Sequence, residues 1–205
     1  MCSRYYIDED LSGGIYELLA RTPSDVCLTA RDVYPGELAP VLTGDKTGLS
    51  WASMRWGFPQ YTGKGLLINA RSETALQKRT FSESVLHRRC VIPARRFYEW
   101  DDSRNKVSFS QEDGTALFMA GFFNLIQDEL RFVILTTEAN ASVRQVHERM
   151  PLILEKDDIE KWIYDPMETQ RFLKKLPLPL ERFQEYEQQS LFAYNSVEVP
   201  YDTKF

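Results

Sequence analysis

The stretch that decides the fold is Arg89–Trp100, RCVIPARRFYEW, whose β-branched and aromatic side chains predict a strand. Further strand-like segments lie on both sides of it, separated by turn signals. The turn at Gly114, between two of these segments, predicts a hairpin. The other predicted strands are Val26–Ala30, Leu49–Phe58, Lys106–Ser110, Ala116–Asn124 and Leu130–Thr136.

Caps, apolar spacing and proline stops predict six short helices. They cover Asp8–Ala20, Ser72–Lys78, Ser82–His87, Ala141–His147, Asp157–Trp162 and Pro166–Lys175. Strands grouped in the first two thirds of the chain, with helices between them, indicate an α+β fold. We expect a mainly antiparallel β-sheet curled into a barrel or sandwich with several short helices, in a single domain over residues 1–205.

The composition excludes several classes of protein. With 205 residues, of which 43% are hydrophobic, the chain can bury a full core. Neither a signal peptide nor a run of about 20 apolar residues is present, so we expect a soluble cytoplasmic protein without a membrane partner. Three widely spaced cysteines argue against a disulfide framework. Because the two histidines belong to no Cys/His cluster, we expect neither a metal nor another cofactor.

The net charge of −5 is unevenly distributed along the chain. Residues 60–96 carry eight Lys or Arg against two acids, whereas residues 155–188 carry nine acids against six bases. One face could therefore hold a nucleic acid while the whole protein stays acidic. The alternative is that the basic residues are spread over solvated faces.

Cys2 is the candidate nucleophile. If Met1 is removed, Cys2 presents an α-amine and a thiol on neighbouring carbons, and this pair can trap an aldehyde, first as an imine and then as a thiazolidine ring. An α-amine titrates near ~8 and a lysine amine near ~10.4, so the terminal amine is the more available one at neutral pH. The alternative is a terminal cysteine without function.

Two segments join polar groups to apolar strands. Asn69 and Arg71 follow an apolar run, where an amide and a guanidinium could bind a sugar oxygen and a phosphate. Helix capping by Asn69 or Ser72, with a solvated Arg71, is the alternative. Glu99 shares a strand face with Phe97. An inward face would desolvate this carboxyl and raise its pKa, whereas an outward face would leave it an ordinary solvated acid.

Two further segments carry weaker signals. His147 suits proton transfer at neutral pH, and Arg149 could anchor a phosphate. A favourable interaction of His147 with a helix C-terminus is the alternative. Trp56 and Pro35 lie in aromatic segments flanked by proline and glycine, whose rings could stack on bases or belong to the core.

Taken together, these segments resemble the SRAP (SOS-response-associated peptidase) domain family, whose members sense abasic sites in single-stranded DNA. Ser3 stands where that family most often has glycine. The motifs that carry the resemblance occur in the family's order over nearly the whole chain: Met1-Cys2 with Arg4, Tyr34-Pro35-Gly36, Trp56-Gly57, Asn69–Thr74, Arg89-Cys90, Phe97–Trp100, Thr136 and His147–Pro151.

The resemblance implies the SRAP fold, a monomer, and a covalent thiazolidine crosslink between Cys2 and an abasic site in single-stranded DNA. In this chemistry Asn69 would orient the amine, Glu99 would act as acid and base, and His147 would assist opening of the sugar. A lyase side activity through the imine, and association with the nucleoid when DNA is bound, are also implied. The implied DNA-binding residues are Arg4, Pro35, Trp56, Arg71, Thr136 and Arg149.

Two alternatives belong to other classes of protein. The first is a cysteine peptidase or amidohydrolase with Cys2 as nucleophile, His147 as base and Glu99 as the orienting group, which includes self-removal of Met1. The second is a noncatalytic single-strand-binding module, for which the state of the Cys2 amine would not matter.

Overall fold

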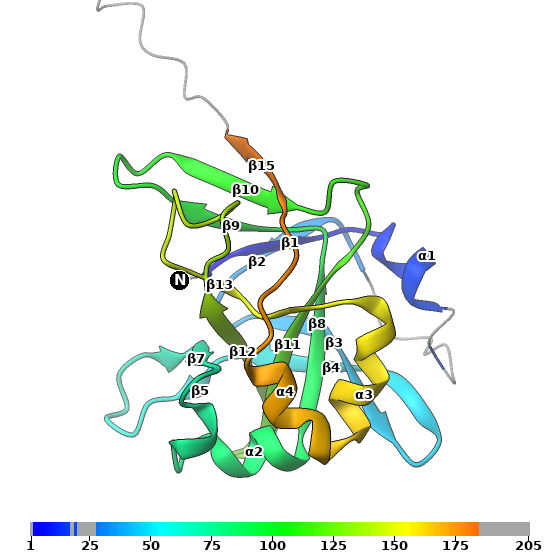
Figure 1. The fold of residues 1–205 in the computed structure, drawn as a ribbon. Helices are drawn as coiled ribbons and strands as arrows, with labels where there is room; N and C mark the ends of the chain where they lie inside the picture. The colour runs from blue at the N-terminus through cyan, green and yellow to red at the C-terminus, as the bar shows by residue number, and fades with distance from the viewer. Residues whose placement is uncertain (1, 17–18, 20–27, 185–205) are drawn as a thin grey trace, which may run out of the picture.

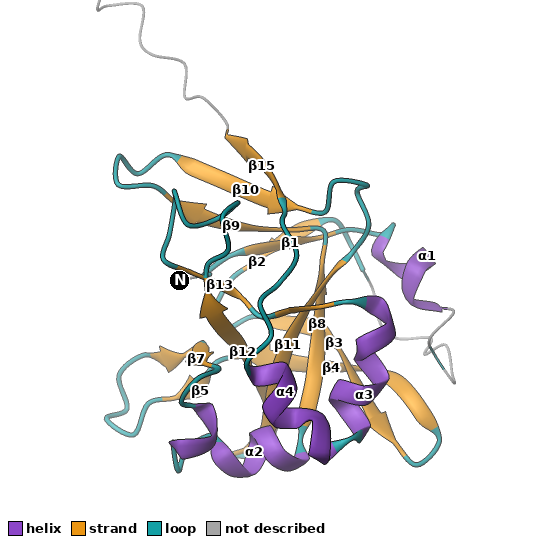
Figure 2. Cartoon of the chain, viewed as in Figure 1, coloured by secondary structure: helices purple, strands orange, loops and turns teal. Residues whose placement is uncertain are grey.

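The computed structural model describes residues 2–16, 19 and 28–184, and strands dominate it (Figures 1 and 2). The strands are β1 Tyr5–Ile7, β2 Arg31–Val33, β3 Leu38–Asp45, β4 Gly48–Trp56, β5 Phe58–Pro59, β6 Leu66–Leu67, β7 Asn69–Arg71, β8 Arg89–Ala94, β9 Arg96–Trp100, β10 Lys106–Ser110, β11 Leu117–Ile126, β12 Glu129–Glu138, β13 Arg149–Pro151, β14 Ile153–Leu154 and β15 Glu181–Gln184. The α-helices are α1 Leu11–Tyr16, α2 Ser82–His87, α3 Ile159–Tyr164 and α4 Thr169–Leu173. The 3₁₀ helices are η1 Ala75–Gln77, η2 Lys156–Asp158 and η3 Pro166–Glu168.

Five strands close into a barrel in the order β3, β4, β12, β11 and β8. Its pairs are antiparallel except β4 with β12, where Trp56 lies opposite Phe132. The rings of these two residues stack at 6.2 Å inside the core, and Phe58 meets Phe122 edge-on at 5.8 Å. β7, β13 and β14 extend the barrel sheet. The predicted α+β fold with a mainly antiparallel barrel is confirmed.

A second sheet has the strand order β15-β10-β9-β1-β2 and is antiparallel throughout. It lies at one end of the barrel, with α2 and α4 at the other end (Figure 1). Within this sheet Tyr5 lies opposite both Val33 in β2 and Phe97 in β9. The first residues of the chain are therefore held between two neighbouring strands.

The stretch Arg89–Trp100 forms two strands rather than one. β8 belongs to the barrel and β9 to the second sheet. At the corner between them, the Arg95 N–H donates to the Tyr6 carbonyl at 2.8 Å, and the Arg95 guanidinium pairs with Asp8 at 3.1 Å. These contacts fix the change of direction, so one stretch of chain ties the two sheets together.

The predicted hairpin around Gly114 is wrong. The turn itself forms, because Gly114 has a φ of +69° and the Asp113 carboxylate accepts the Thr115 N–H at 2.9 Å. However, β10 pairs with β9 and β15, whereas β11 pairs with β8, β12 and β14. The turn therefore carries the chain from one sheet to the other.

The sequence prediction also lacks β3 and misplaces β2. β3 is buried without interruption over Ala39–Leu42 and contains Pro40, so it shows none of the alternation that marks a half-buried strand. Of the predicted strand Val26–Ala30, residues 26–27 lie outside the described residues and residues 28–30 form no strand. The strand begins at Arg31 instead.

The helix predictions fare unevenly. α2 coincides with the predicted Ser82–His87, and the segments near residues 157 and 166 each begin as a 3₁₀ turn and continue as α3 and α4. The helix predicted over Asp8–Ala20 contracts to α1, with part of it outside the described residues, and the one over Ser72–Lys78 contracts to η1.

Residues 141–146 form turns, and no helix covers the predicted Ala141–His147. Asn140 therefore caps no helix but closes a turn, because its Oδ1 accepts the Ser142 N–H at 3.0 Å. Its Nδ2 also donates to the carbonyls of Pro177 and Leu178, at 3.1 and 2.8 Å, and these tertiary contacts hold the segment in turns. No helix among the described residues has the length and apolar character needed to cross a membrane.

Candidate functional site

Cys2 lies just before β1 and is fully buried. The Asn69 side-chain amide donates to the Cys2 carbonyl at 2.7 Å. Asn69 begins β7, which runs parallel to β12 with Asn69 opposite Ile134. The barrel therefore supplies an amide that fixes the backbone of the candidate nucleophile.

Glu99 lies in β9, the strand that pairs with β1. The side chain is only 3% exposed, and Phe97 on the same face is fully buried, so the inward orientation considered in the sequence analysis is the correct one. Burial raises the pKa of Glu99 to about 7. Burial, together with the nearby negative charge of Glu99, raises the pKa of the Cys2 thiol well above its usual value. Glu99 is thus close enough to Cys2 to influence its protonation.

His147 lies in the turn segment that precedes β13. Its Nδ1 lies 2.9 Å from the Arg149 backbone nitrogen and 3.2 Å from the Arg149 carbonyl oxygen, so the Arg149 backbone holds the ring in place. Burial lowers the pKa of His147, so the neutral ring is favoured at pH 7. Because residues 141–147 form no helix, the interpretation of His147 as a partner of a helix C-terminus is wrong.

Arg149 is engaged by groups from two other segments. Its guanidinium donates to both carboxylate oxygens of Glu73, at 2.7 and 2.8 Å, and to the Thr136 carbonyl at 2.6 Å. The side chain is only 14% exposed. Although burial favours the neutral acid, the hydrogen bonds from Arg149 hold the pKa of Glu73 below its usual range. A phosphate could reach Arg149 only by competing with Glu73.

Arg71 offers a more accessible cation. It is exposed at the end of β7 and lines a cavity of about 340 Å³ together with Asn69, Thr74 and Lys78. This cavity is lined by two basic side chains and by no acidic one. It adjoins the amide that holds Cys2, so its charge suits a phosphate next to the reacting residue.

Arg4 is surrounded by aromatic rings. Its guanidinium carbon lies 4.8 Å from the centroid of Tyr34, 5.1 Å from Trp100 and 5.9 Å from Tyr98, and its Nη1 lies 3.7 Å from Asp32. The side chain remains 27% exposed. Sequence reasoning did not place Tyr34 or Trp100 against Arg4, although both belong to motifs that it identified.

Trp56 lies in the core and not on a surface that could face DNA. The ring is fully buried, and its Nε1–H donates to the Ile68 carbonyl at 3.0 Å. The expectation that Trp56 contacts a DNA strand directly is therefore corrected to a packing role. Thr136 is also fully buried, and its hydroxyl lies 3.4 Å from the Ala70 carbonyl, where β7 meets β12. Pro35 is half-buried in the turn between β2 and β3.

The structure brings Cys2, Asn69 and Glu99 together, and it places Arg149 at the start of β13, next to the end of β12, with His147 just before that strand. Sequence reasoning gave no partner to Arg149, because Glu73 is 76 positions away and nothing local links the two. Among the described residues, no three His, Cys, Asp or Glu side chains gather in a way that could hold a metal.

Fold and site define a class: an α+β barrel protein whose N-terminal cysteine is held by an amide beside a buried carboxyl group. The profile of the family described as SOS response associated peptidase (SRAP) matches residues 1–194. The chain therefore belongs to the SRAP family, as its motifs indicated.

Known relatives share one kind of name. The chain is 30% identical over 164 residues to the abasic site processing protein YoaM of Bacillus subtilis, covering 73% of this chain and 72% of the relative. It is 29% identical over 140 residues to the abasic site processing protein YedK of Escherichia coli, covering 64% and 63%. It is 30% identical over 142 residues to the abasic site processing protein HMCES of Gallus gallus, covering 55% and 42%.

Solved structures have the same fold. A crystal structure of a Bordetella bronchiseptica protein superposes with a TM-score of 0.75 at 25% identity, covering 91% of this chain and 100% of that one. A Bacteroides thetaiotaomicron protein superposes with a TM-score of 0.74 at 21% identity, covering 89% and 91%.

Proposed function

We propose that this protein captures abasic sites in single-stranded DNA by forming a covalent thiazolidine through Cys2 after removal of Met1. The name shared by its relatives, abasic site processing protein, supports the choice of lesion. The observation that carries the proposal is the placement of Cys2, whose carbonyl accepts the Asn69 amide at 2.7 Å beside the buried carboxyl of Glu99.

The proposed reaction has two balanced steps. The Cys2 amine adds to C1′ of the open aldehyde, and the resulting carbinolamine loses water to give an imine. The S–H group of Cys2 then adds across the C=N bond, so that sulfur bonds to C1′ and the thiol proton ends on nitrogen. One water leaves in total, and no oxidant or cofactor is consumed.

Protonation supports this order of steps. Since burial raises the pKa of the Cys2 thiol, the thiol keeps its proton at neutral pH and the amine reacts first. Glu99, with a pKa of about 7, is well matched to protonate the departing hydroxyl group, to regain a proton from nitrogen as the imine forms, and then to relay the thiol proton to that nitrogen.

The remaining residues serve the sugar and the phosphates in this proposal. The His147 ring, held by the Arg149 backbone and favoured in its neutral form, assists proton transfer to the sugar oxygen as the sugar ring opens. Arg71 and Arg4 contact flanking phosphates, while Pro35, Trp56 and Thr136 keep the site in shape. With these two phosphate contacts, the log–log salt slope of noncovalent binding should be only about −1.4.

Intact mass spectrometry after incubation with an oligonucleotide that carries one abasic site tests the proposal. We expect a heat-stable adduct that maps to Cys2 and no adduct with undamaged DNA. A protein with two extra residues ahead of Cys2 is the matched control and should form none. Equal adduct yield from this blocked protein would contradict the proposal.

Self-removal of Met1 is a second candidate activity, favoured by the peptidase in the family's description and by the closeness of Glu99 to Cys2. Protein made in a cell-free system without methionine aminopeptidase should then still lose Met1, and the Glu99→Gln variant should retain it. Retention of Met1 by both proteins would assign the removal to a separate aminopeptidase.

A further inference from the structure

The segment of residues 69–78 lies between two cavities and contributes side chains to the lining of both. Asn69, Arg71 and Lys78 face the basic cavity described above, whereas Ser72, Glu73 and their neighbours Leu76 and Gln77 face a larger one of about 640 Å³. The larger cavity has a size typical of small-molecule sites, which span about 300–1,000 Å³.

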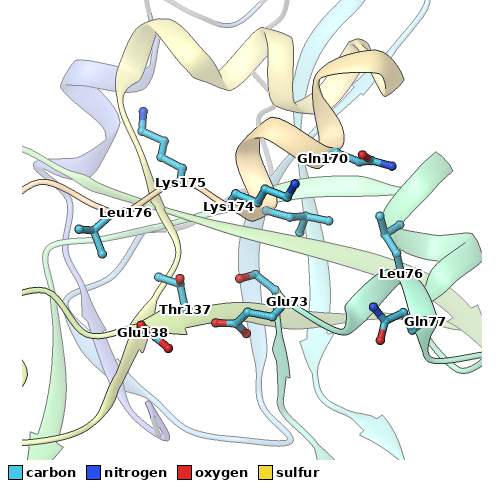
Figure 3. A pocket seen from close by; sticks show the side chains of 11 residues that line it. Glu73, Leu76, Gln77, Thr137, Glu138, Gln170, Lys174, Lys175 and Leu176 are labelled. Carbon is cyan, nitrogen blue, oxygen red and sulfur yellow. The ribbon is translucent and has the colours of Figure 1, made fainter.

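The larger cavity combines an apolar wall with paired hydrogen-bonding groups (Figure 3). Figure 3 shows Leu76, Gln77 and Gln170 toward one end and Leu176, Thr137 and Glu138 toward the other, with Lys174 and Glu73 between them. The leucines offer apolar contact. The side-chain amides can donate and accept hydrogen bonds, whereas the ionised carboxylates only accept them. A flat heterocycle with donors and acceptors on its edge has the matching chemistry.

One side-chain hydroxyl of the lining is buried and makes no hydrogen bond within the part of the chain that the structure describes. Ser72 is 2% exposed, and its hydroxyl oxygen makes no hydrogen bond among the described residues. A buried hydroxyl without a hydrogen-bond partner costs stability, and a partner for it could come from a molecule bound in the cavity. Thr137 adds a second buried hydroxyl to the lining.

The charges of the lining disfavour a phosphate and favour a neutral ligand with donor groups. Lys175 is committed to Glu155 and Asp158, and Glu73 to Arg149. Of the charged lining groups, Glu138 and Lys174 form no ion pair within the described part of the chain. The basic cavity on the other side of residues 69–78 shows the opposite pattern, which suits a phosphate.

We propose that the larger cavity receives an unstacked nucleobase with an exocyclic amino group from the strand that carries the abasic site. The phosphate of that nucleotide lies on the Arg71 and Lys78 side of this segment, and the amino group donates to Glu138. This inference rests on the proposed function and adds a base preference at a fixed distance from the lesion.

The test uses oligonucleotides with one abasic site in a run of thymines, where cytosine replaces one thymine at a time. At a single position, cytosine should speed crosslinking about tenfold at limiting protein concentration, as expected for one hydrogen bond to a charged acceptor. Gln77→Trp, which fills the cavity from an exposed position, and Glu138→Gln should each abolish this preference and leave the rate on the all-thymine strand unchanged. Glu160→Gln, at an exposed position on α3 outside the cavity, is the matched control and should keep the preference.

Fluorescence separates failure of this inference from failure of the proposed function. 2-Aminopurine at the preferred position should brighten severalfold on binding, even in a complex that forms no crosslink, and Gln77→Trp should prevent the change. Crosslinking without any base preference, or a preference that survives both cavity variants, would overturn the inference while the crosslinking function stands. Unchanged fluorescence at every position would overturn it as well and would assign the cavity to a ligand of another class, such as a peptide.

Discussion

Glu73 and Arg149 form a bidentate ion pair, with hydrogen bonds of 2.7 and 2.8 Å that join segments 76 positions apart. The pair connects the segment that follows β7 to the first residue of β13. The Arg149 backbone N–H in turn holds the His147 ring at 2.9 Å. A carboxylate thus occupies the place on Arg149 that a DNA phosphate would take.

Replacing Glu73 with Gln should therefore strengthen noncovalent binding of single-stranded DNA. Arg149 would be free to contact a phosphate, and the log–log salt slope should become steeper by about 0.7. Fluorescence anisotropy over a range of salt concentrations measures both effects. Stability should change by less than about 1 kcal/mol, because the Glu73 side chain is 42% exposed and its ion pair is partly solvated. Glu112→Gln, at another exposed position, is the control, and a salt slope equal in both variants would refute competition by Glu73.

Glu99→Gln should be more stable than the parent above pH 7 and much slower in crosslinking. The folded protein holds the Glu99 proton up to a pH of about 7, whereas the unfolded chain releases it near 4.5. The contribution of this carboxyl group to the free energy of unfolding is therefore fully present below about pH 4.5 and is lost as the pH rises through 7. The neutral amide avoids that loss, so the variant should gain roughly 1–3 kcal/mol at pH 8, as followed by urea unfolding.

A stability difference between parent and Glu99→Gln that does not change between pH 4.5 and 8 would mean that Glu99 titrates as an ordinary acid. The crosslinking rate of the parent should itself vary through pH 7, and that of the Gln variant should lose this inflection.

Asn69→Ala and Asn69→Asp should both slow crosslinking by about tenfold to a hundredfold, because neither side chain can donate to the Cys2 carbonyl. The test is the single-turnover rate at saturating abasic DNA. Asn124→Ala, on the β11–β12 hairpin, controls for loss of an asparagine elsewhere. A parental rate for Asn69→Asp would show that the donated hydrogen bond does not position the nucleophile.

Trp56→Phe should lower stability and leave DNA binding unchanged. The variant loses the bond from Nε1 to the Ile68 carbonyl inside the core, at a cost of about 1–3 kcal/mol. Trp100→Phe, beside Arg4, should show the opposite pattern, with near-parental stability and weaker binding. Denaturant unfolding measures the stability of both variants, and fluorescence anisotropy measures their binding of single-stranded DNA. Weaker binding by Trp56→Phe at full stability would restore the role of a DNA contact to this residue.

Cys2→Ser should keep an amine but lose the ability to close the stable ring. We expect an adduct that borohydride reduction traps and that heating destroys without reduction, whereas the parental adduct survives heating. Gel analysis with and without borohydride distinguishes the two. A heat-stable adduct from Cys2→Ser would rule out the thiazolidine.

Features set by local periodicity could be predicted from the sequence. The shared strand face of Phe97 and Glu99 follows from their spacing, because alternation along a strand is a property of the strand itself. That this face points inward could not be predicted, because it depends on what packs against the strand. α2 likewise appears where its local signals place it. The closeness of Cys2, Asn69 and Glu99 was reached only through the family resemblance, because they come from three separated strands or their ends.

Features set by the pairing of distant segments could not be predicted. The turn chemistry at Gly114 specifies a reversal of the chain but not which sheet each strand joins, and the hairpin prediction failed for that reason. A tryptophan in a glycine-flanked segment gives no sign of its depth, so only the closed barrel reveals that Trp56 is internal. The partner of Arg149 depends on how β7 and β13 both meet β12.

The order of residues around Cys2 has a consequence for protein synthesis. The site residues Asn69, Glu99 and His147 are all translated after Cys2, with His147 following by 145 positions. At about 5–20 residues per second, the ribosome needs roughly 7–30 s to reach His147. During that interval Cys2 cannot yet be buried. A methionine aminopeptidase at the exit tunnel could therefore reach Met1 before the barrel forms.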